Sequence, residues 1–549
     1  MIIGERKKMR EQVLSGDQAL AYGALQAGIS LVTSYPGSPS SGVVKELLRL
    51  SERNTLIIEW SANEKVAVEN AIGAAIAGKR TLVCAKGVGM NVALDPIMVA
   101  DLIGTHAGMV WLIGDDPGAW GSQNEQDSRY LGSFAEVPIL EPSSPQEGYE
   151  MMGYAFDLSE KYRLPVMVRE VQTYSSLKGD CQISESPWQP RSIGSQASGR
   201  WISFPLNVLE HHARLHEKNR QIARDFDGSP FNSVVRASAR GLLAAGLAWH
   251  KFKSLDAASA RTLSLFKLGT LYPLPEKILA EFLAPLSELL VFEETEPFLE
   301  EKVKALAQAQ GIPVRVRGKM TGEFPREGEI FSHHIFQALE QFLGSLEEED
   351  RKKIRVEKKE RPLGKGFCEG CPYTPLFEAI QEVCQESSLP SPIITADPGC
   401  AVRLSNPPFG ILNIKYCMGA SIALAAGVSK AGAQERVVAA CGDSSFYHTG
   451  INALIDAAHH RADILVIILD NGATALTGLQ PHPGIPRDAR GREVPAVKLE
   501  EIVHAIPIDF FRLIDMFDKE KSKPVLREAL TRKGLGVIIA RGLCPLLNQ

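Results

Sequence analysis

The chain has 549 residues, of which 44% are hydrophobic and 23% are charged, a composition typical of an ordinary globular protein with several domains. Its formal net charge of −5 gives no reason to expect a nucleic acid or an anionic membrane surface as a partner. No apolar run is long enough to cross a bilayer, and the first residues, MIIGERKKMREQ, lack the hydrophobic region of a signal peptide, so we expect a cytoplasmic protein.

The first 185 residues are predicted to form a doubly wound parallel α/β domain. Apolar strand patterns alternate with helical patterns from Gly16 to Val171. This alternation is typical of a parallel sheet with helices on both faces. The strand patterns are ISLVTSYPG, NTLIIEW, KRTLVCAKG, GMVWLIGDDPG, VPILEPSS and LPVMVRE.

The rest of the chain divides into four parts. Residues 186–230 are rich in Ser, Pro, Arg and His and predict a connecting segment, whereas residues 231–345 carry the strand signals of a smaller α/β domain. The charged residues 346–365 predict a linker or a solvated helix. Strand patterns return in residues 366–549 and predict a second doubly wound domain. The expected fold is therefore α/β, with two doubly wound domains flanking a smaller one.

Two polar turns in the last domain are the most informative feature of the sequence. Gly442-Asp443-Ser444 ends one buried strand pattern, and Asp470-Asn471-Gly472-Ala473 ends the next. In a parallel sheet both turns emerge at the carboxyl edge, where ligands bind. The side chains of Asp443 and Asn471 and the carbonyl of Ala473 can then offer three oxygens to Mg²⁺, and phosphate oxygens complete the octahedron.

The same turns suit a diphosphate. Gly442 lets the backbone approach an anion closely, and the helix that begins around Ser444 and Ser445 favours a negative charge at its N-terminus. The pair of turns resembles the thiamine diphosphate motif GDG…NN, with Ser444 as its third residue and Asp470-Asn471 as the Asn pair. The alternative is an ordinary βαβ unit with polar loop ends.

A thiamine enzyme also needs a carboxylic acid at N1′ of the aminopyrimidine ring, because that hydrogen bond favours the tautomer whose N4′ takes the proton from C2. Glu64 is the catalytic candidate, since it lies where the pattern TLIIEW ends and the helical pattern KVAVENAIGAAIAG begins. Glu64 could instead be a first-turn residue favoured by the helix dipole. Glu59 and Glu69 are rival candidates.

Two further polar loops follow strands of the first domain. Tyr35, Pro36, Gly37 and Ser38 begin a loop whose two prolines, one glycine and three serines make a rigid polar turn. Gly89 lies in the loop KGVGMN, after the pattern TLVCA. Each loop could be turn chemistry alone, but loops at one sheet edge predict a pocket. We expect both loops to contact the cofactor, and Ser38 to contact the substrate as well.

A set of motifs together resembles the alpha subunit of indolepyruvate:ferredoxin oxidoreductase, a thiamine-dependent 2-oxoacid:ferredoxin oxidoreductase. The motifs occur in the family's order between residues 30 and 544, and they are YPGSPSS, EWSANEKVAVE, GVGMN, GDDPG…SQNEQDSR, EPSSPQEGYEM, GFCEGCP, CMGAS and TGLQPHPG. The resemblance implies a transketolase-C-terminal-like fold for the middle domain. Met418 and Gly419 of CMGAS are expected to contact the cofactor.

The resemblance also implies a reaction and partners. Family members convert an aryl pyruvate and coenzyme A to aryl-acetyl-CoA, CO₂ and reduced ferredoxin, together with a smaller subunit in a hetero-oligomer. Alpha subunits of the family usually continue into a ferredoxin-like module with two CxxCxxCxxxC runs, which this sequence lacks. We therefore expect the electrons to pass to ferredoxin or to a ferredoxin-like subunit.

Nine cysteines, an odd number in a large chain, do not suggest a disulfide framework. Cys368 and Cys371 form a CxxC pair, and Cys400 and Cys544 each follow a strand pattern of the last domain. Four such thiolates could hold a [4Fe–4S] cluster, and related ferredoxin oxidoreductases carry one in this domain with similar spacing. Cys417 is a rival fourth ligand. A zinc site and unligated cysteines are the alternatives.

Some assignments stay open at this point. His482 in QPHPG follows the metal loop and is a candidate to face the substrate, or else a solvated loop histidine. The chain could also be a non-oxidative thiamine-dependent decarboxylase or carboligase, which needs no cluster, or a non-catalytic subunit. The sequence distinguishes neither the 2-oxoacid nor the subunit stoichiometry.

Overall fold

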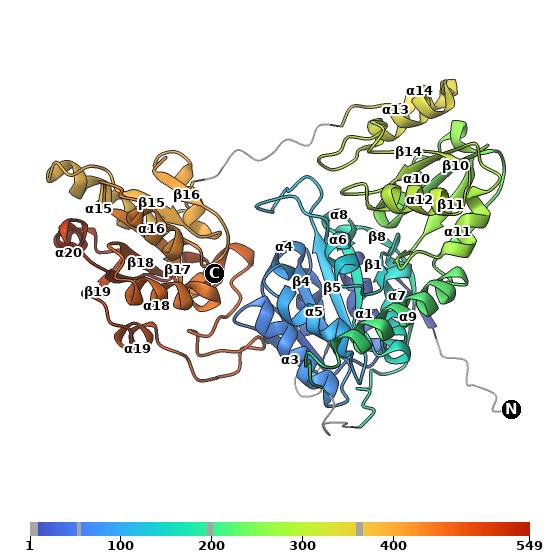
Figure 1. Cartoon of the computed structure of the whole chain (residues 1–549). Coiled ribbons are helices and arrows are strands. Elements are labelled where there is room, and N and C mark those ends of the chain that lie inside the picture. Colours follow the sequence, from blue (N-terminus) through green and yellow to red (C-terminus); the bar gives the residue numbers. More distant parts are fainter. Residues whose placement is uncertain (1–8, 52–55, 195–200, 358–365, 549) are drawn as a thin grey trace. The chain divides into compact units, whose positions relative to one another are not determined.

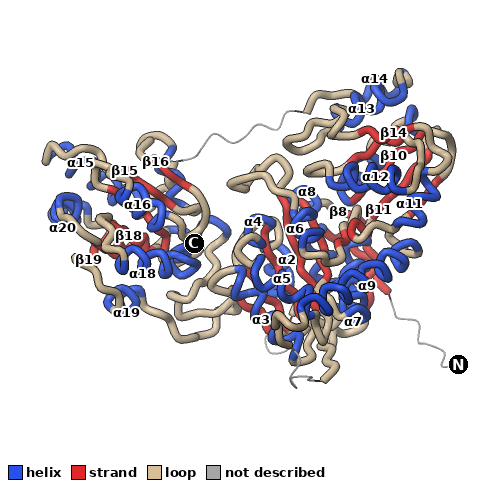
Figure 2. The backbone as a smooth tube through the Cα atoms, in the orientation of Figure 1, coloured by secondary structure: helices blue, strands red, loops and turns tan. Residues whose placement is uncertain are grey.

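The computed structural model describes residues 9–51, 56–194, 201–357 and 366–548 (Figure 1, Figure 2). The chain divides into two compact units, Met1–Glu59 with Glu64–Glu360, and Trp60–Asn63 with Arg361–Gln549. Parallel sheets with helices packed against them form the core of each unit, which confirms the predicted fold class. No helix of the described residues is long and apolar enough to cross a membrane.

The first unit contains a seven-stranded sheet in the order β12-β6-β7-β5-β4-β2-β3. The neighbours β2 and β4, β4 and β5, β5 and β7, and β6 and β7 run parallel. β12, which comes last of these seven strands along the chain, pairs with β6 in the antiparallel direction. The strands are β2 (Leu31–Ser34), β3 (Ile57–Trp60), β4 (Thr81–Lys86), β5 (Met109–Asp115), β6 (Ile139–Leu140), β7 (Val166–Val171) and β12 (Thr270–Tyr272).

Three of the helices that pack on this sheet begin at a residue whose side chain caps the helix N-terminus. Ser15 and Gln18 form a capping box at the first helix, and the side chains of Asp127 and Ser144 cap two later ones. The helices are α1 (Gly16–Gln26), α2 (Ser41–Leu50), α3 (Glu64–Ile76), α4 (Gly87–Met90), α5 (Leu94–Ile103), α6 (Ser128–Phe134), α7 (Pro145–Tyr162) and α8 (Gln172–Ser176).

A strand pair and a helix of this unit have weak sequence signals. The strands β1 (Met9–Ser15) and β8 (Lys178–Ser184) form a separate antiparallel pair, in which β1 buries a single apolar side chain, Leu14. The predicted connecting segment contains α9 (Val208–Asp227), a helix of 20 residues. Its buried apolar residues, Leu215, Ile222 and Phe226, are few and widely spaced, so charged residues mask the helical period.

A five-stranded sheet in the order β14-β13-β10-β11-β9 completes the first unit. Its strands are β9 (Ser233–Val235), β10 (Arg240–Ala245), β11 (Ser264–Leu268), β13 (Glu288–Phe292) and β14 (Arg315–Arg317). Its helices are α10 (Gly246–Ser254), α11 (Glu276–Leu283), α12 (Phe298–Ala309), α13 (Ser332–Leu343) and α14 (Glu348–Lys353), with a 3₁₀ turn at Ala258–Ala260. One hydrophobic core contains residues of both sheets, such as Trp111 and Phe266, so the two α/β layers form one body.

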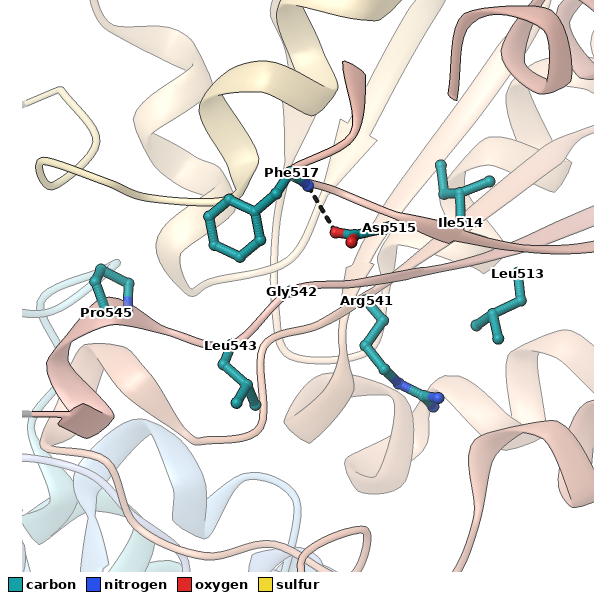
Figure 3. Close-up of a pocket in the computed structure, with 8 residues that line it drawn as sticks. All are labelled: Leu513, Ile514, Asp515, Phe517, Arg541, Gly542, Leu543 and Pro545. Atoms are coloured by element: carbon teal, nitrogen blue, oxygen red, sulfur yellow. Dashed lines mark hydrogen bonds between the residues drawn. The ribbon is translucent and has the colours of Figure 1, made fainter. Parts of the chain in front are cut away.

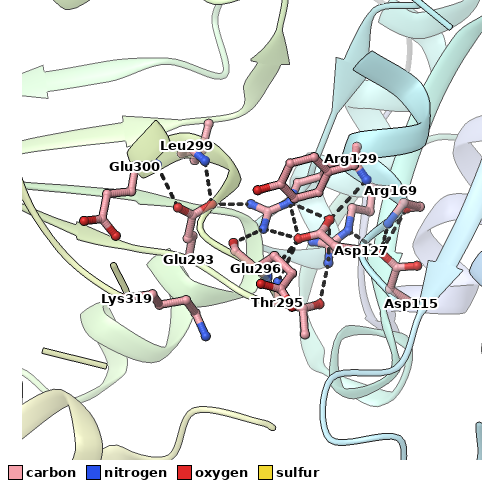
Figure 4. A network of polar contacts seen from close by, with 12 residues as sticks. Asp115, Asp127, Arg129, Arg169, Glu293, Thr295, Glu296, Leu299, Glu300 and Lys319 are labelled. Carbon is pink, nitrogen blue, oxygen red and sulfur yellow. Dashed lines mark hydrogen bonds and ion pairs between the residues drawn. The ribbon is translucent and has the colours of Figure 1, made fainter. Parts of the chain in front are cut away.

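A buried ionic network also joins the two α/β layers of this unit (Figure 4). Arg169 donates to Asp115 Oδ2 at 2.7 Å and to Glu141 Oε2 at 2.8 Å. Arg129 donates to Glu293 Oε2 at 2.8 Å, and Asp127 forms an ion pair with Arg129. Both arginine side chains are at most 1% exposed. Because charges so deeply buried are costly unless paired, each arginine depends on its acids and each acid on an arginine.

The second unit contains a six-stranded parallel sheet in the order β16-β15-β17-β18-β20-β19. Its strands are β15 (Ile393–Ala396), β16 (Leu412–Lys415), β17 (Val437–Gly442), β18 (Leu465–Asp470), β19 (Phe510–Asp515) and β20 (Gly536–Arg541). Two separate hydrophobic cores contain alternate residues of these strands, as a sheet covered on both faces requires.

The helices of this unit are α15 (Tyr373–Glu386), α16 (Ser421–Lys430), α17 (Asp443–Ser445), α18 (Ile451–His459), α19 (Leu499–His504) and α20 (Lys519–Thr531). A π-helical turn, Phe446–Gly450, joins α17 to α18. Short 3₁₀ turns occur at Cys400–Ser405, Ala475–Thr477 and Pro545–Asn548. The loops that follow β15, β17, β18 and β20 all leave the sheet at its carboxyl edge.

Candidate active site

The two polar turns predicted from the sequence meet in the second unit. β17 and β18 are parallel neighbours, with Gly442 in register with Leu469, so their carboxyl ends coincide. Asp443 Oδ2 accepts hydrogen bonds from the backbone N–H groups of Asn471 at 3.1 Å and Gly472 at 2.9 Å. Ser444 and Thr474, one from each turn, are linked by their hydroxyls at 3.0 Å. A single buried carboxylate thus holds both motifs together.

These oxygens suit a hard cation. Asp443 is 2% exposed and accepts three backbone N–H bonds, the third from Ser444 at 2.7 Å. A carboxylate has about four acceptor positions, so capacity for a cation remains. Asn471 Nδ2 donates to the hydroxyl of Tyr373 at 2.8 Å, and this bond fixes which way the amide oxygen points. The Ala473 N–H donates to Asn471 Oδ1 at 3.1 Å, so Asp443, Asn471 and Ala473 lie together, and their binding of Mg²⁺ stays a prediction.

The predicted cofactor contacts in this unit lie around the same turn. Ser445 Oγ contacts Met418 Sδ at 3.7 Å, and the Met418 carbonyl accepts from Thr449 Oγ1 at 2.9 Å. Gly419 has φ +72°, and a Cβ there would lie 2.0 Å from Thr449 Oγ1, so only glycine fits. A Cβ on Gly442 would meet nothing nearer than Ser445 Oγ at 3.9 Å. The space beside Gly442 is open for a ligand such as a diphosphate.

His482 lies against the metal loop. Its Nε2 is 3.2 Å from Asp443 Oδ2, and its Nδ1 accepts from the Gly484 N–H at 3.2 Å. The ring stacks on Tyr447, with centroids 5.3 Å apart, and the residue is 8% exposed. His482 is thus a buried neighbour of Asp443 and not a solvated loop histidine. Its contact with a substrate stays a prediction.

The cysteines of the predicted cluster lie at the same edge of the sheet. Burial, together with the charges of Cys368 and Cys544, raises the pKa of Cys371 to about 11. Burial and the same neighbours, with Cys371 added, raise the pKa of Cys400 to about 12. A Cβ on Gly370 of the CxxC loop would lie 4.0 Å from Pro545, the residue after Cys544. Residues more than 170 positions apart therefore come together.

These thiols do not form a compact group in the described residues, so the cluster stays a prediction. Of the described residues, no three of these cysteines have their sulfur atoms all within 4.8 Å of one another. A zinc ion with four bonds of about 2.3 Å would hold its sulfur ligands closer than that. An iron–sulfur cluster is larger than one ion and separates its ligands further. Cys417 is exposed. Among the residues that raise the pKa values of Cys371 and Cys400 is Cys544, whereas Cys417 is not one of the main causes.

Tyr373 connects the cysteines to the metal loop, a role that the sequence did not reveal. It is the second residue after Cys371 and the first of α15, and its hydroxyl accepts from Asn471. Burial raises the pKa of Tyr373 well above its usual value, and Asp443, Cys400 and Cys371 raise it further. The only sequence signal for it was its position directly beside the CxxC pair.

A hollow of about 690 Å³ lies beside Cys544 at the ends of β19 and β20 (Figure 3). Leu513, Phe517 and Leu543 line it with apolar surface, and each of these side chains is about half exposed. Arg541 lines the same hollow and pairs with Asp470 at 2.7 Å. The cysteine edge of the sheet is thus bordered by an accessible apolar surface.

The candidate residues of the first unit also gather at one sheet edge. Glu64 begins α3 and is 7% exposed. A Cβ on Gly89 would lie 2.3 Å from Glu64 Oε1, so the carboxylate fits only because residue 89 is glycine. The predicted loop of Gly89 and the predicted acid are therefore direct neighbours.

The loop after β2 lies beside them. The Gly37 N–H donates to Ser41 Oγ at 2.7 Å, and the Ser40 hydroxyl donates to the Gly37 carbonyl at 3.2 Å. A Cβ on Gly37 would meet Lys86 Cβ at 3.0 Å, which places this loop against the one that contains Gly89. Tyr35 and Pro36 are buried, whereas Ser38 is exposed. The geometry is that of a pocket rim, and the contacts of these residues with ligands stay predictions.

Comparisons with known proteins agree with this geometry. Residues 22–176 match the pyruvate flavodoxin/ferredoxin oxidoreductase thiamine diphosphate-binding domain, and residues 397–540 match the C-terminal thiamine pyrophosphate-binding domain of thiamine pyrophosphate enzymes. These ranges contain Glu64 and Gly89 in the first case, and Asp443 and Asn471 in the second. The chain thus carries both kinds of thiamine-binding domain.

Similar proteins cover nearly the whole chain. It is 35% identical over 539 residues to the indolepyruvate oxidoreductase subunit IorA of Methanothermobacter marburgensis, covering 97% of this chain and 87% of the relative. The IorA subunit of Archaeoglobus fulgidus is also 35% identical, with 97% and 86% covered. A solved 2-oxoglutarate:ferredoxin oxidoreductase from Magnetococcus marinus shares the fold, with a TM-score of 0.50 and 14% identity over 61% of this chain and 65% of that one.

The match over almost the full length, with both thiamine-binding domains and their candidate residues in place, establishes the family. The predicted resemblance is confirmed. The chain belongs to the IorA family of thiamine diphosphate-dependent 2-oxoacid:ferredoxin oxidoreductase subunits.

Proposed function

We propose that this chain catalyses the oxidative decarboxylation of an aryl pyruvate such as indolepyruvate, with coenzyme A, to aryl-acetyl-CoA and CO₂. Two electrons leave the substrate in this reaction and pass to ferredoxin or to a ferredoxin-like subunit. The contact that carries the proposal is the hydrogen bond between Tyr373 and Asn471, because it joins the diphosphate loops to the cysteines within one unit. The aryl preference is supported by relatives named indolepyruvate oxidoreductase.

Bound thiamine diphosphate supplies a carbon nucleophile and an electron sink. The side-chain oxygens of Asp443 and Asn471 and the carbonyl of Ala473 would hold the Mg²⁺ that fixes the diphosphate. Gly442 leaves room for the phosphates beside the backbone. Glu64 would hydrogen-bond N1′ of the aminopyrimidine ring and so keep N4′ ready to accept a proton.

Cys368, Cys371, Cys400 and Cys544 would hold a [4Fe–4S] cluster. Support comes from the neighbours of two of these thiols: besides burial, Cys368 and Cys544 raise the pKa of Cys371, and the same two residues with Cys371 raise the pKa of Cys400. Since the pKa values of Cys371 and Cys400 lie well above neutrality, loading iron would release protons from these thiols. Burial next to the diphosphate loop suits one-electron transfer from the substrate.

The chain would act with a smaller oxidoreductase subunit, as the naming of its relatives as subunits suggests. The test is anaerobic co-purification with that subunit, followed by a viologen reduction assay with coenzyme A. We expect dye reduction that requires coenzyme A and is faster with indolepyruvate than with 2-oxoglutarate. Release of CO₂ without dye reduction would instead identify a non-oxidative decarboxylase. No turnover of any 2-oxoacid by the assembled complex would indicate a non-catalytic subunit.

Replacing Glu64 by Gln tests the catalytic assignment. We expect kcat of the assembled complex to fall about 10²–10⁴-fold, the range for loss of a positioned acid–base group, while thiamine diphosphate stays bound. Glu69→Gln is the matched control, because Glu69 lies on the same helix and its exposed side chain pairs with Lys65. Equal losses in the two variants, or full activity of Glu64→Gln, would remove Glu64 from catalysis.

Replacing Cys371 by Ser tests the cluster. The expected result is a fall from about four irons per chain to a small remainder, with thiamine diphosphate binding retained. Cys544→Ser should have the same effect and Cys417→Ser should have none, as measured by iron and acid-labile sulfide. Loss of iron in Cys417→Ser but not in Cys544→Ser would identify Cys417, and not Cys544, as the fourth ligand.

Tyr373→Phe removes the hydroxyl that holds the Asn471 amide. A buried hydrogen bond contributes about 1 kcal/mol, so we expect Mg²⁺-dependent thiamine diphosphate binding to weaken about five- to tenfold, with unchanged iron content. Titration calorimetry measures the affinity. Tyr416→Phe, at a 66% exposed tyrosine of the same unit, is the control. Equal affinities in Tyr373→Phe and the unaltered chain would show that the bond does not position Asn471.

A further inference from the structure

Two histidines and a glutamate converge on the surface of the first unit, and none of them is among the residues assigned above. His212 and His216 lie one turn apart on α9, and Glu136 follows α6. Among the residues that the structure describes, Glu136, His212 and His216 form a group of possible metal ligands, because their ligand atoms all lie within 4.8 Å of one another. The residue types are those that bind transition metals.

The distances fit a small divalent ion. Nε2 of His212 is 3.0 Å and Nε2 of His216 is 3.2 Å from the same oxygen, Oε1 of Glu136. Tetrahedral zinc with bonds of about 2.1 Å keeps its ligand atoms about 3.4 Å apart. The two nitrogen–oxygen distances therefore need to change by only a few tenths of an ångström, and the two Nε2 atoms lie within 4.8 Å of each other. Two imidazoles that aim their Nε2 atoms at one carboxylate oxygen are already arranged as ligands.

The fold holds these ligands in place. α9 buries Leu215, Asn219, Ile222 and Phe226 along one face. Asn219 Nδ2 donates to the Glu136 carbonyl at 2.9 Å, so the helix is bound to the turn that carries the carboxylate. The side chains of His212 and His216 are 47% and 48% exposed and that of Glu136 is 23% exposed. An ion from solution can reach all three.

A fourth residue points to a ligand independently. Asp101 on α5 is 4% exposed, and its Oδ1 is buried without a hydrogen-bond partner. Helix α5 packs against α9, so this unpartnered oxygen lies on an element next to the one that carries the two histidines. A buried acceptor on that element can take a hydrogen bond from a metal-bound water.

We propose that Glu136, His212 and His216 form a structural zinc site that clamps α9 onto the turn after α6. Imidazole nitrogen and carboxylate oxygen favour zinc over magnesium or calcium. A water in the fourth position would donate to Asp101. The site is independent of thiamine chemistry, since none of its residues belongs to the candidate active site. Its role is to fix the helix that precedes the five-stranded sheet.

The test is titration of the full chain with Zn²⁺ alone at pH 7.5, by calorimetry and by thermal unfolding. We expect one zinc per chain at this site, a rise of several degrees in Tm, and slower hydrogen exchange in residues 208–220. His212→Ala, His216→Ala and Glu136→Gln should each weaken binding at least tenfold and abolish the Tm rise. His211→Ala, on the same helix but outside the group, is the matched control and should bind as the unaltered chain does.

The cysteines could bind zinc as well, so Cys368→Ser/Cys371→Ser is titrated in parallel and should keep the α9 effects. Three results would overturn the proposal: absence of zinc binding, binding unchanged in His212→Ala, or loss of all binding in the cysteine variant. Because catalysis is not measured, the result does not depend on the proposed function.

Discussion

Asp443→Ala is expected to abolish binding of thiamine diphosphate with Mg²⁺. The change removes a predicted metal ligand and also the acceptor of three backbone N–H bonds, two of which hold the turn after β17 to the turn after β18. Hydrogen bonds to a charged group contribute about 1.5–3 kcal/mol each. A loss of roughly 4 kcal/mol already corresponds to a thousandfold weaker affinity, so we expect at least that decrease.

Calorimetric titration with the cofactor and Mg²⁺ measures this loss, and circular dichroism checks that the variant is folded. Asp443→Asn retains an acceptor for the N–H bonds but not the charge, so its affinity should be intermediate. Asp456→Ala is the matched control, since this aspartate lies on α18 with its side chain 64% exposed. Cofactor affinity within threefold of normal in Asp443→Ala would show that the carboxylate does not hold the site.

Arg129→Met is expected to be the most destabilising single change in the first unit. It leaves Asp127 and Glu293 buried without their shared cation. Removing one partner of a buried ion pair costs about 3–5 kcal/mol. Burial raises the pKa of Glu293 to about 7, so this acid can partly relieve the loss by taking up a proton. Asp127 has less relief, because Arg169, which also lowers the pKa of this acid, stays 3.8 Å away from it in the variant.

The unfolding transition of the full chain, followed by calorimetry, measures this effect as a fall in Tm. Arg220→Met is the control, because Arg220 pairs with Glu217 on the exposed face of α9, where an ion pair contributes at most about 1 kcal/mol. Adding Glu293→Gln to Arg129→Met should restore part of the lost stability, since one uncompensated acid is then removed. An Arg129→Met protein as stable as the control would show that the network does not stabilise the unit.

The parts of the site that follow from strand order alone could be predicted from the sequence. Asp443 and Asn471 end consecutive buried strands, and such strands are often neighbours in a parallel sheet, so their meeting could be expected. Glu64 and Gly89 lie shortly after the ends of β3 and β4 in the first sheet. In each case a turn directly after a strand pattern was enough to place a residue at the ligand edge.

Contacts that depend on packing could not be predicted. The bond between Tyr373 and Asn471 requires the start of α15 to pack beside β18, and no periodicity encodes that. The pairing of β12 with β6 joins a strand of the middle domain to the first sheet, across more than a hundred residues. The edge strand β19 has a weak sequence signal, because Arg512 and Asp515 interrupt its apolar pattern. Tertiary packing decides all three.

The central claim is that this chain is a thiamine-dependent oxidoreductase subunit with an inner iron–sulfur cluster. The most direct measurement is iron, acid-labile sulfide and thiamine diphosphate on one sample of the chain, purified anaerobically. We expect one thiamine diphosphate and about four irons with matching sulfide per chain. Thiamine diphosphate without iron, under conditions that preserve clusters, would contradict the cysteine assignment and favour non-oxidative chemistry. Iron without thiamine diphosphate would contradict the site at Asp443 and Asn471.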